Sequence, residues 1–248
     1  MTEKGYQRKD RPNQTVAFID FETTGFDPKE EQITQYAIVV YQNGEQIAKQ
    51  SRLVQLHGDH HINEAVHNLT GFTDEYLAEN GVPEEQAYKE LKEAMKLDKK
   101  PLIVGYNVNF DANFLNQMAI KYDGNPLDAD YLDPLTISRD KLDIQRHKLA
   151  QSCEYYGITI PRAHDAFNDT VALVKLTEEM DRDFNMEEYI NKIGYMEKYG
   201  MPKNLLNGVE YIPQQFNSFP KNGEEKLTNA PVKKNEVKHG PKKDFDME

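Results

Sequence analysis

An apolar run that ends in two carboxylates constrains the fold of this chain more than any other feature. The stretch Val16–Pro28 reads VAFIDFETTGFDP, and its first four residues are typical of a buried β-strand. Side chains two positions apart on a strand point to the same face, so Asp20 and Glu22 converge on one point. Such a pair is either a solvated strand end or part of a site that holds positive charge.

Hydrophobic periodicity and turn residues predict an α/β fold. Asn43-Gly44 between two β-prone runs is a strong hairpin signal, so the first three strands should form an antiparallel meander. Strands and helices then alternate, which predicts a mixed sheet with added parallel strands, flanked by helices. The predicted strands cover Val16–Asp20, Ile33–Tyr41, Ile47–Leu56, Pro101–Tyr106 and Tyr131–Leu135. The predicted helices cover Pro83–Leu97, Phe110–Tyr122, Leu149–Tyr156 and Ala166–Met180, with short helical pieces over His57–Ala78 that break at Gly71.

Composition changes along the chain predict four regions. The last is rich in Lys, Glu, Asn and Pro and poor in apolar residues, a composition typical of disorder. The third holds a further helix over Met186–Tyr199 and a short strand within Leu205–Pro213. The regions are a flexible leader (1–14), a main domain (15–184), a C-terminal extension (185–220) and a tail predicted to be disordered (221–248).

Charge and cysteine content narrow the function classes. A formal net charge of −12 argues against broad electrostatic gripping of duplex nucleic acid, which depends on many Lys and Arg residues. No run approaches the length that crosses a bilayer, and the polar N-terminus lacks the apolar centre of a signal peptide. The single cysteine, Cys153, excludes an internal disulfide and is typical of a buried apolar filler. These features favour a cytoplasmic protein.

Two further segments carry acids at predicted helix starts. GYNVNFDANFL (Gly105–Leu115) places Asp111 just after a strand, and RAHDAFNDTVAL (Arg162–Leu173) places Asp169 one turn into a helix. Asp165 is a plausible N-cap of that second helix, with His164 just ahead of it. Each acid alone is ordinary, because acids stabilise helix N-termini.

Together the acids predict a metal site. Four carboxylates that meet in one pocket repel one another, and burying them unpaired costs several kcal/mol each. Either some of them are protonated or divalent cations neutralise them, and oxygen-rich, cysteine-free sites suit Mg²⁺ or Mn²⁺. The four carboxylates are Asp20, Glu22, Asp111 and Asp169.

The three segments resemble the three exonuclease motifs of the DEDDh (DnaQ-like) 3′–5′ exonuclease superfamily. DFETTG is similar to the first motif, GYNVNFDANFL to the second, and HDAFND, with its H-x-x-x-x-D spacing, to the third. INEAVHNLTGFTDEYL resembles the element between the first two motifs, and HKLAQSCEYYGI the helix before the third. The resemblance covers roughly residues 15–182. Many members have His before Asn in the second motif, where this chain has Tyr106, a difference that bears on substrate contacts and touches no metal ligand.

The resemblance implies an RNase H-like fold and two-metal phosphodiester hydrolysis. It assigns His164 as the general base, which suits an imidazole at physiological pH. Nucleoside 5′-monophosphates would leave from the 3′ end. The metal ligands implied are Asp20, Glu22, Asp111 and Asp169, and the substrate contacts implied are Thr23, Thr24, Gly25, Asn107 and Phe110. Phe26 is a candidate for stacking on a base, and both Phe residues have core packing as the alternative.

Substrate and partners stay open at this stage. The same motifs serve proofreading subunits, single-strand DNA trimmers, oligoribonucleases and RNA 3′ processors. The acidic body favours short or single-stranded ends, or delivery by a DNA polymerase partner. A non-catalytic binding module on the same fold is disfavoured because every acid and His164 are present. Gln215, Phe216 and Phe219 loosely resemble a peptide that binds sliding clamps, with a packed loop as the commoner interpretation.

Overall fold

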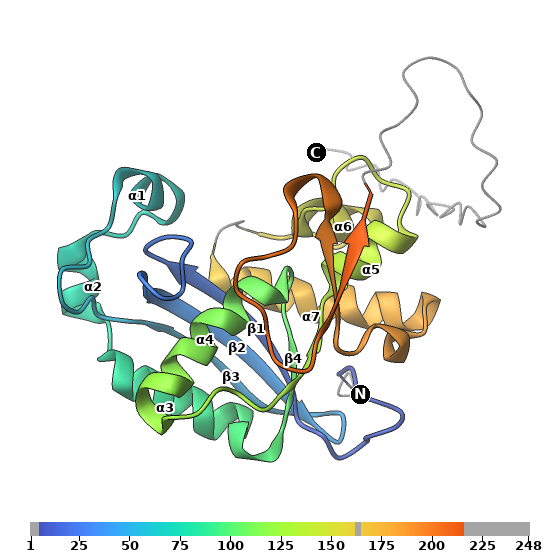
Figure 1. The fold of residues 1–248 in the computed structure, drawn as a ribbon, viewed down its shortest axis with the longest axis horizontal. Coiled ribbons are helices and arrows are strands. Elements are labelled where there is room, and N and C mark those ends of the chain that lie inside the picture. Colours follow the sequence, from blue (N-terminus) through green and yellow to red (C-terminus); the bar gives the residue numbers. More distant parts are fainter. Residues whose placement is uncertain (1–4, 162–164, 216–248) are drawn as a thin grey trace, which may run out of the picture. The chain divides into compact units, whose positions relative to one another are not determined.

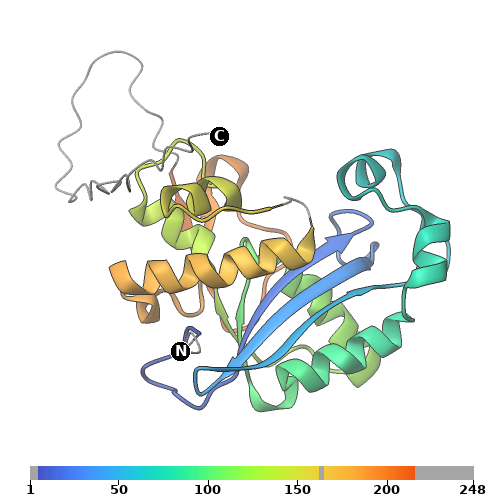
Figure 2. The same ribbon diagram turned by 180° about the vertical axis from the view of Figure 1, so that it is seen from behind.

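A five-stranded mixed sheet organises the protein (Figures 1 and 2). The computed structural model describes residues 5–161 and 165–215. The strand order is β3-β2-β1-β4-β5, with antiparallel pairing from β3 to β1 and parallel pairing from β1 to β5. The predicted α/β class, with a meander followed by parallel strands, is confirmed. The strands are β1 (Val16–Thr23), β2 (Ile33–Gln42), β3 (Glu45–Leu53), β4 (Leu102–Val104) and β5 (Asp130–Leu132).

Local turn chemistry builds the meander. Asn43 and Gly44 both have positive φ angles, 53° and 76°, as the tight hairpin between β2 and β3 requires. The predicted break at Gly71 is also confirmed, since this residue ends a helix at φ 77°.

Helices cover both faces of the sheet. Figure 2 shows α7 lying across one face, while α3 and α4 lie on the other. Within the described ranges, no helix is long and apolar enough to cross a membrane. The helices are α1 (Glu64–Thr70), α2 (Asp74–Asn80), α3 (Glu84–Met95), α4 (Val108–Asp123), α5 (Pro134–Lys141), α6 (Leu149–Tyr155) and α7 (Ala166–Asp183), with short 3₁₀ turns at Leu97–Lys99, Met186–Tyr189 and Glu197–Tyr199.

Alternation along β1 sets the direction of the site. Ala17 and Ile19 belong to the core under α3 and α4, and Phe18 belongs to the core under α7. Because strand side chains alternate, Asp20 and Glu22 continue the row of Phe18 and project on the α7 side. Cys153 is buried and free, in the same core as Phe18, as predicted.

Two local predictions differ from the structure. The strand predicted to run to Leu135 ends at Leu132, because Asp133 caps α5 and Pro134 occupies its first turn. The helix predicted over Met186–Tyr199 is wrong. This segment holds a 3₁₀ turn and then β6 (Lys192–Met196), which pairs in parallel with β7 (Glu210–Gln214).

The extension covers the outer edge of β5. Asn191 donates its backbone N–H to the carbonyl of Tyr131 (2.8 Å), and the side-chain oxygen of Asn191 accepts the backbone N–H of Tyr131 (2.8 Å). Internal contacts divide the chain after Asn217, so the extension and the sheet belong to one unit.

Candidate active site

The carboxyl end of β1 is the place where the site is built. β4 ends at Val104, opposite Phe18, so the last part of β1 has no parallel neighbour among the described strands. Asp111 fills this gap from the first turn of α4, and its Oδ1 accepts the backbone N–H of Phe21 at 2.9 Å. A residue distant in sequence is thereby fixed against the strand that carries Asp20 and Glu22.

The start of α7 supplies the fourth acid. Asp165 caps this helix, because its side chain accepts the backbone N–H of Asn168 at 3.1 Å. Asp169 lies in the first turn, and its charge acts on both Asp20 and Glu22. The four carboxylates therefore come from β1, α4 and α7 and interact electrostatically.

Three of these carboxylates have raised pKa values. Burial, followed by the charges of Asp111 and Glu22, raises the pKa of Asp20 well above its usual value. Burial and the charges of Asp169 and Asp165 raise the pKa of Glu22 to about 7. Burial raises the pKa of Asp111 to about 8, although its backbone hydrogen bond from β1 opposes the shift. Among the described residues, no cation is a main influence on the pKa of Asp20 or Glu22.

The donor set has the chemistry of a site for hard divalent cations. All four side chains offer carboxylate oxygens, and Asp111 is only 4% exposed. Within residues 5–161 and 165–215, no group of three or more His, Cys, Asp or Glu side chains forms a ready-made metal site as it stands. The residues thus fit a metal by type and charge without being preassembled around one. His164, the predicted general base, lies outside the described residues.

The last residue of β1, Thr23, and the loop after it supply three predicted substrate residues, Thr23, Thr24 and Gly25. Thr23 donates its hydroxyl to the carbonyl of Gly25 at 2.6 Å. Thr24 is buried, and its hydroxyl donates to Glu31 and accepts the N–H of Gln32. The Thr24 side chain therefore shapes the loop, together with its backbone N–H, which donates to the carbonyl of Gln32 at 3.0 Å.

Two aromatic rings stand beside this loop. Phe26 is 91% exposed, and its ring meets that of Phe110 edge to face at 6.4 Å between centroids. Phe110 in turn contacts Phe114 at the margin of the core. The exposed Phe26 ring rests against the partly buried Phe110 ring, and an exposed ring held in this way is suited to stacking against a planar group.

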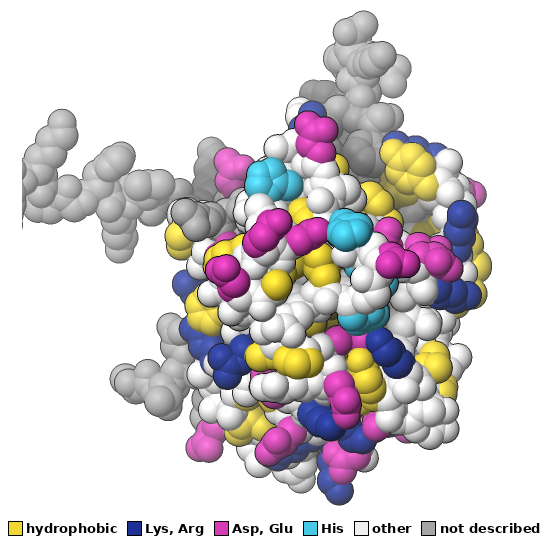
Figure 3. Space-filling view, turned by 90° about the vertical axis from the view of Figure 1, so that its left-hand side faces the viewer, with side chains coloured by type: hydrophobic (Ala, Val, Ile, Leu, Met, Phe, Trp, Pro, Cys, Tyr) yellow, Lys and Arg dark blue, Asp and Glu magenta, His cyan; other side chains and the backbone are white. Residues whose placement is uncertain are grey.

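Asn63 is a link that sequence reasoning missed. Its side-chain oxygen caps α1 through the N–H of Val66 (3.0 Å), while its amide donates to the carbonyl of Thr24 (3.2 Å). Figure 3 views the side on which α1 and α2 lie. His side chains lie in the upper and central part of this face, and acidic side chains lie both there and in its lower part. Lys and Arg lie mostly toward the lower part and the edges of that face.

Tyr106 and Asn107 play different parts. The Tyr106 hydroxyl donates to the carbonyl of His147 (3.0 Å) and lies 2.6 Å from the Ser152 hydroxyl, so it anchors the segment before and within α6. Asn107 is exposed, has a φ of 72°, and donates its N–H to Asp133 (3.0 Å) just before α4 begins.

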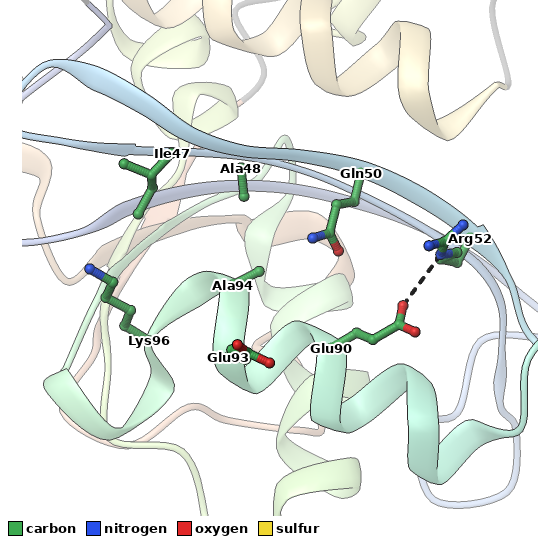
Figure 4. A pocket seen from close by; sticks show the side chains of 8 residues that line it. All are labelled: Ile47, Ala48, Gln50, Arg52, Glu90, Glu93, Ala94 and Lys96. Atoms are coloured by element: carbon green, nitrogen blue, oxygen red, sulfur yellow. Dashed lines mark hydrogen bonds and ion pairs between the residues drawn. The ribbon is translucent and has the colours of Figure 1, made fainter.

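A groove of about 530 Å³ lies elsewhere, between β3 and α3 (Figure 4). An ion pair between Arg52 and Glu90 (3.4 Å) crosses it, and Gln50 points toward α3. Neither β3 nor α3 carries a residue of the predicted site.

Comparison with known proteins identifies the family of this chain. The exonuclease family RNase_T matches residues 17–177. The PolC-type DNA polymerase III of Ureaplasma parvum is 32% identical over 170 residues, which cover 68% of this chain and 12% of that protein. The PolC-type enzyme of Thermotoga petrophila is 28% identical over 199 residues, which cover 80% of this chain and 14% of that protein. The chain thus spans only a small part of the length of these relatives.

Solved structures of E. coli exonuclease I share the fold. The complex with a dT13 oligonucleotide has a TM-score of 0.60 at 20% identity, covering 68% of this chain and 41% of that one. The zinc-bound form of the complex with single-stranded DNA has a TM-score of 0.63 at 20% identity, covering 71% of this chain and 42% of that one. With its motifs, its sheet and a family match over most of its length, the chain belongs to the RNase_T exonuclease family and has the RNase H-like, DnaQ-like fold that its sequence predicts.

Proposed function

We propose that this protein is a metal-dependent 3′–5′ exonuclease that releases nucleoside 5′-monophosphates from the 3′ end of DNA, in proofreading or single-strand trimming. The observation that carries the proposal is the electrostatic convergence of the four carboxylates on the end of β1. The names of the relatives support DNA as the substrate, since one group is a DNA polymerase and the solved structures hold DNA oligonucleotides.

Two divalent cations, Mg²⁺ or Mn²⁺, are the proposed cofactors. Enzymes of this family generally depend on divalent metal ions. The proposed ligands are the four carboxylates, and the raised pKa values of Asp20, Glu22 and Asp111 fit a site that awaits positive charge. When bound, such a pair lowers the pKa of a water molecule and offsets charge on the leaving oxygen. Because like charges push carboxylates apart, we expect the side chains to close in as cations bind.

The chain itself supplies orientation and proton transfer. In this proposal His164 takes the proton of the attacking water, and Asp165 fixes the start of α7 beside it. Thr23, Thr24 and Gly25 line the terminal nucleotide. Phe26, which contacts Phe110 edge to face, stacks on a nucleobase, and this stacking does not depend on which base it is.

A panel of labelled substrates tests the proposal. The 248-residue chain is incubated with single-stranded DNA, with a mismatched primer–template and with RNA of the same sequence, in Mg²⁺, in Mn²⁺ and in the presence of a chelator. We expect stepwise 3′ shortening of DNA that the chelator abolishes, whereas faster shortening of RNA would identify an exoribonuclease. Absence of hydrolysis of every substrate with both metals would overturn the proposal.

The matched variants are Asp20→Ala and Asp128→Ala. The first removes a proposed ligand and should abolish metal-dependent hydrolysis while the far-ultraviolet circular dichroism spectrum stays unchanged. The second removes a carboxylate that is 77% exposed and pairs with Lys100, and it should behave like the wild type. Full activity of Asp20→Ala would end the assignment.

Protein partners are a separate proposal. A DNA polymerase is one candidate, because the matched relatives carry that name. A sliding clamp is another, through Gln215, Phe216 and Phe219, of which the two Phe residues lie outside the described residues. Gln215 donates to Glu197 at 3.2 Å. A pull-down with a purified clamp, with and without Phe216→Ala and Phe219→Ala together, tests this interaction.

A further inference from the structure

The first turns of α4 are held by residues outside the segment that matches the exonuclease family. Asp111 has an asparagine two positions away on each side, Asn109 and Asn113, and Asn113 is only 4% exposed. Asn113 donates its amide to the backbone carbonyl of Asn109 at 2.7 Å, so the two residues form one hydrogen-bonded group. Neither of them belongs to the proposed metal ligands.

The C-terminal extension satisfies both asparagines. The backbone carbonyl of Asn204 accepts the amide of Asn109 at 3.2 Å and that of Asn113 at 3.3 Å. The hydroxyl of Tyr211, on β7, donates to the Asn109 side-chain oxygen at 2.6 Å and accepts the N–H of Leu206 at 2.8 Å. One phenol therefore joins the extension loop to the helix turn that carries Asp111.

The extension can act as a rigid support because it is itself fixed. Tyr211 pairs with Ile193 of β6, and Ile193 is buried in the core under α3 and α4. Leu206 is buried in the same core. Burial raises the pKa of Tyr211, so its hydroxyl keeps the proton that it donates to Asn109. Both Asn204 and Tyr211 lie beyond residue 177, where the family match ends.

We propose that Tyr211 is a positioning residue of the exonuclease site: through Asn109 it holds the first turns of α4 and so keeps Asp111 against β1. This inference rests on the proposed function. Residues that orient a ligand without touching the metal commonly contribute about 10–100-fold to metal affinity or activity. The hydrogen bond from the backbone N–H of Phe21 to the Asp111 carboxylate requires that the first turn of α4 stays in place.

The test is Tyr211→Phe in the full chain, which deletes one hydroxyl and keeps the ring. We expect the dissociation constant of Mn²⁺, measured by calorimetry without nucleic acid, to rise about 10-fold. The Mg²⁺ concentration for half-maximal hydrolysis should rise in parallel, while KM for single-stranded DNA at saturating Mg²⁺ stays unchanged. The control is Tyr199→Phe, on a residue of the same extension that is 79% exposed, and it should match the wild type in each measurement.

A second variant removes the other partner of the hydrogen bond between Tyr211 and Asn109. Asn109→Ala removes the acceptor of the Tyr211 hydroxyl, so the double variant should bind Mn²⁺ no more weakly than Asn109→Ala alone. A lower unfolding midpoint with wild-type Mn²⁺ affinity in Tyr211→Phe would reduce the residue to a structural role and overturn the inference.

The proposed function can fail separately. If wild type binds Mn²⁺, and Asp20→Ala does not, while Tyr211→Phe matches wild type, only the positioning role is lost. If wild type neither binds Mn²⁺ nor hydrolyses DNA, the proposed function fails and the positioning role with it.

Discussion

Acids that repel one another persist in a fold when their function outweighs the stability they cost. Asp20 is such a residue, because burial and then the charges of Asp111 and Glu22 all disfavour its ionised form. The placement of these acids at the end of a strand or the start of a helix could be predicted from the sequence, because the flanking residues have strand or helix patterns. Their mutual influence could not, because it depends on how α4 and α7 approach β1.

His164 is expected to act in catalysis without holding metal. Changing His164 to Ala should lower kcat by about 10²–10⁴-fold, because a general base contributes that much to proton transfer. Single-turnover hydrolysis of labelled DNA at saturating Mg²⁺ measures the change. Calorimetry should find the Mn²⁺ affinity unaltered, and a parallel loss of affinity would reassign the side chain as a ligand.

Asp133 makes stability depend on pH. Burial raises its pKa to about 6, against the bonds from Asn107 and Leu135 and the charge of Arg139. An acid with a raised folded-state pKa stabilises the fold at low pH, and this contribution is lost as pH rises from about 4 to about 6. Asp133→Asn keeps the Oδ1 acceptor and should therefore be more stable than wild type by about 3 kcal/mol at pH 8.

Urea unfolding of Asp133→Asn and wild type at pH 4 and pH 8 tests this pH dependence. The difference between the two proteins should shrink toward zero at pH 4, where the wild-type carboxyl is largely protonated in the folded state. An equal difference at both pH values would show that lost hydrogen bonds or packing, rather than ionisation, govern the variant.

At the scale of elements, the N-terminal segment is tied to β5 by a buried ion pair. Arg8, 6% exposed, bonds to Asp130 at 2.7 Å and also contacts Asp10, while Arg11, 53% exposed, bonds to the same oxygen at 3.0 Å. Breaking a buried pair costs about 3–5 kcal/mol, whereas an exposed pair is worth about 0–1 kcal/mol.

Arg8→Ala and Arg11→Ala form a matched pair for this segment. We expect the first to lower the free energy of unfolding by about 3 kcal/mol and the second by less than about 1 kcal/mol. Chemical denaturation at pH 7 and moderate salt measures both. Equal effects would mean that the N-terminal segment detaches from β5 at little cost in free energy, and that the burial of Arg8 contributes little to stability.

Elements with local signals were the predictable ones. The Asn43-Gly44 turn and the break at Gly71 each depend on a single backbone conformation that the residue type favours. β6 was not predictable from local spacing, because its identity as a strand comes from pairing with β7 at a distance in sequence. α5 carried a signal in Asp133-Pro134, but the apolar residues before it also fitted a longer strand.

For the whole molecule, the sequence predicts an exonuclease domain at residues 15–184, and the structure packs residues after 184 into the cores of that domain. Residues of the extension are buried in both cores, on either face of the sheet. Local sequence patterns did not indicate this packing, because the apolar side chains of the extension follow no sustained helical or strand period. The buried set comprises Met186, Tyr189, Ile193, Met196 and Leu206.

Two truncations test this dependence. A chain that ends at residue 184 loses the five buried side chains, each worth about 1.5–3 kcal/mol, and bares the edge of β5. Since whole domains are stable by only about 5–15 kcal/mol, this chain should not fold cooperatively. A chain that ends at residue 215 keeps every one of these contacts, and its midpoint should stay within about 2 °C of the full chain.

Thermal unfolding measured by circular dichroism separates the two cases, and Mg²⁺-dependent hydrolysis of single-stranded DNA reports on the site. The longer truncation product should retain both the cooperative transition and the hydrolysis rate. If the chain ending at residue 184 unfolds cooperatively near the wild-type midpoint, the extension is not required for folding. The extension would then influence the site through the hydrogen bond from Tyr211 to Asn109 on α4.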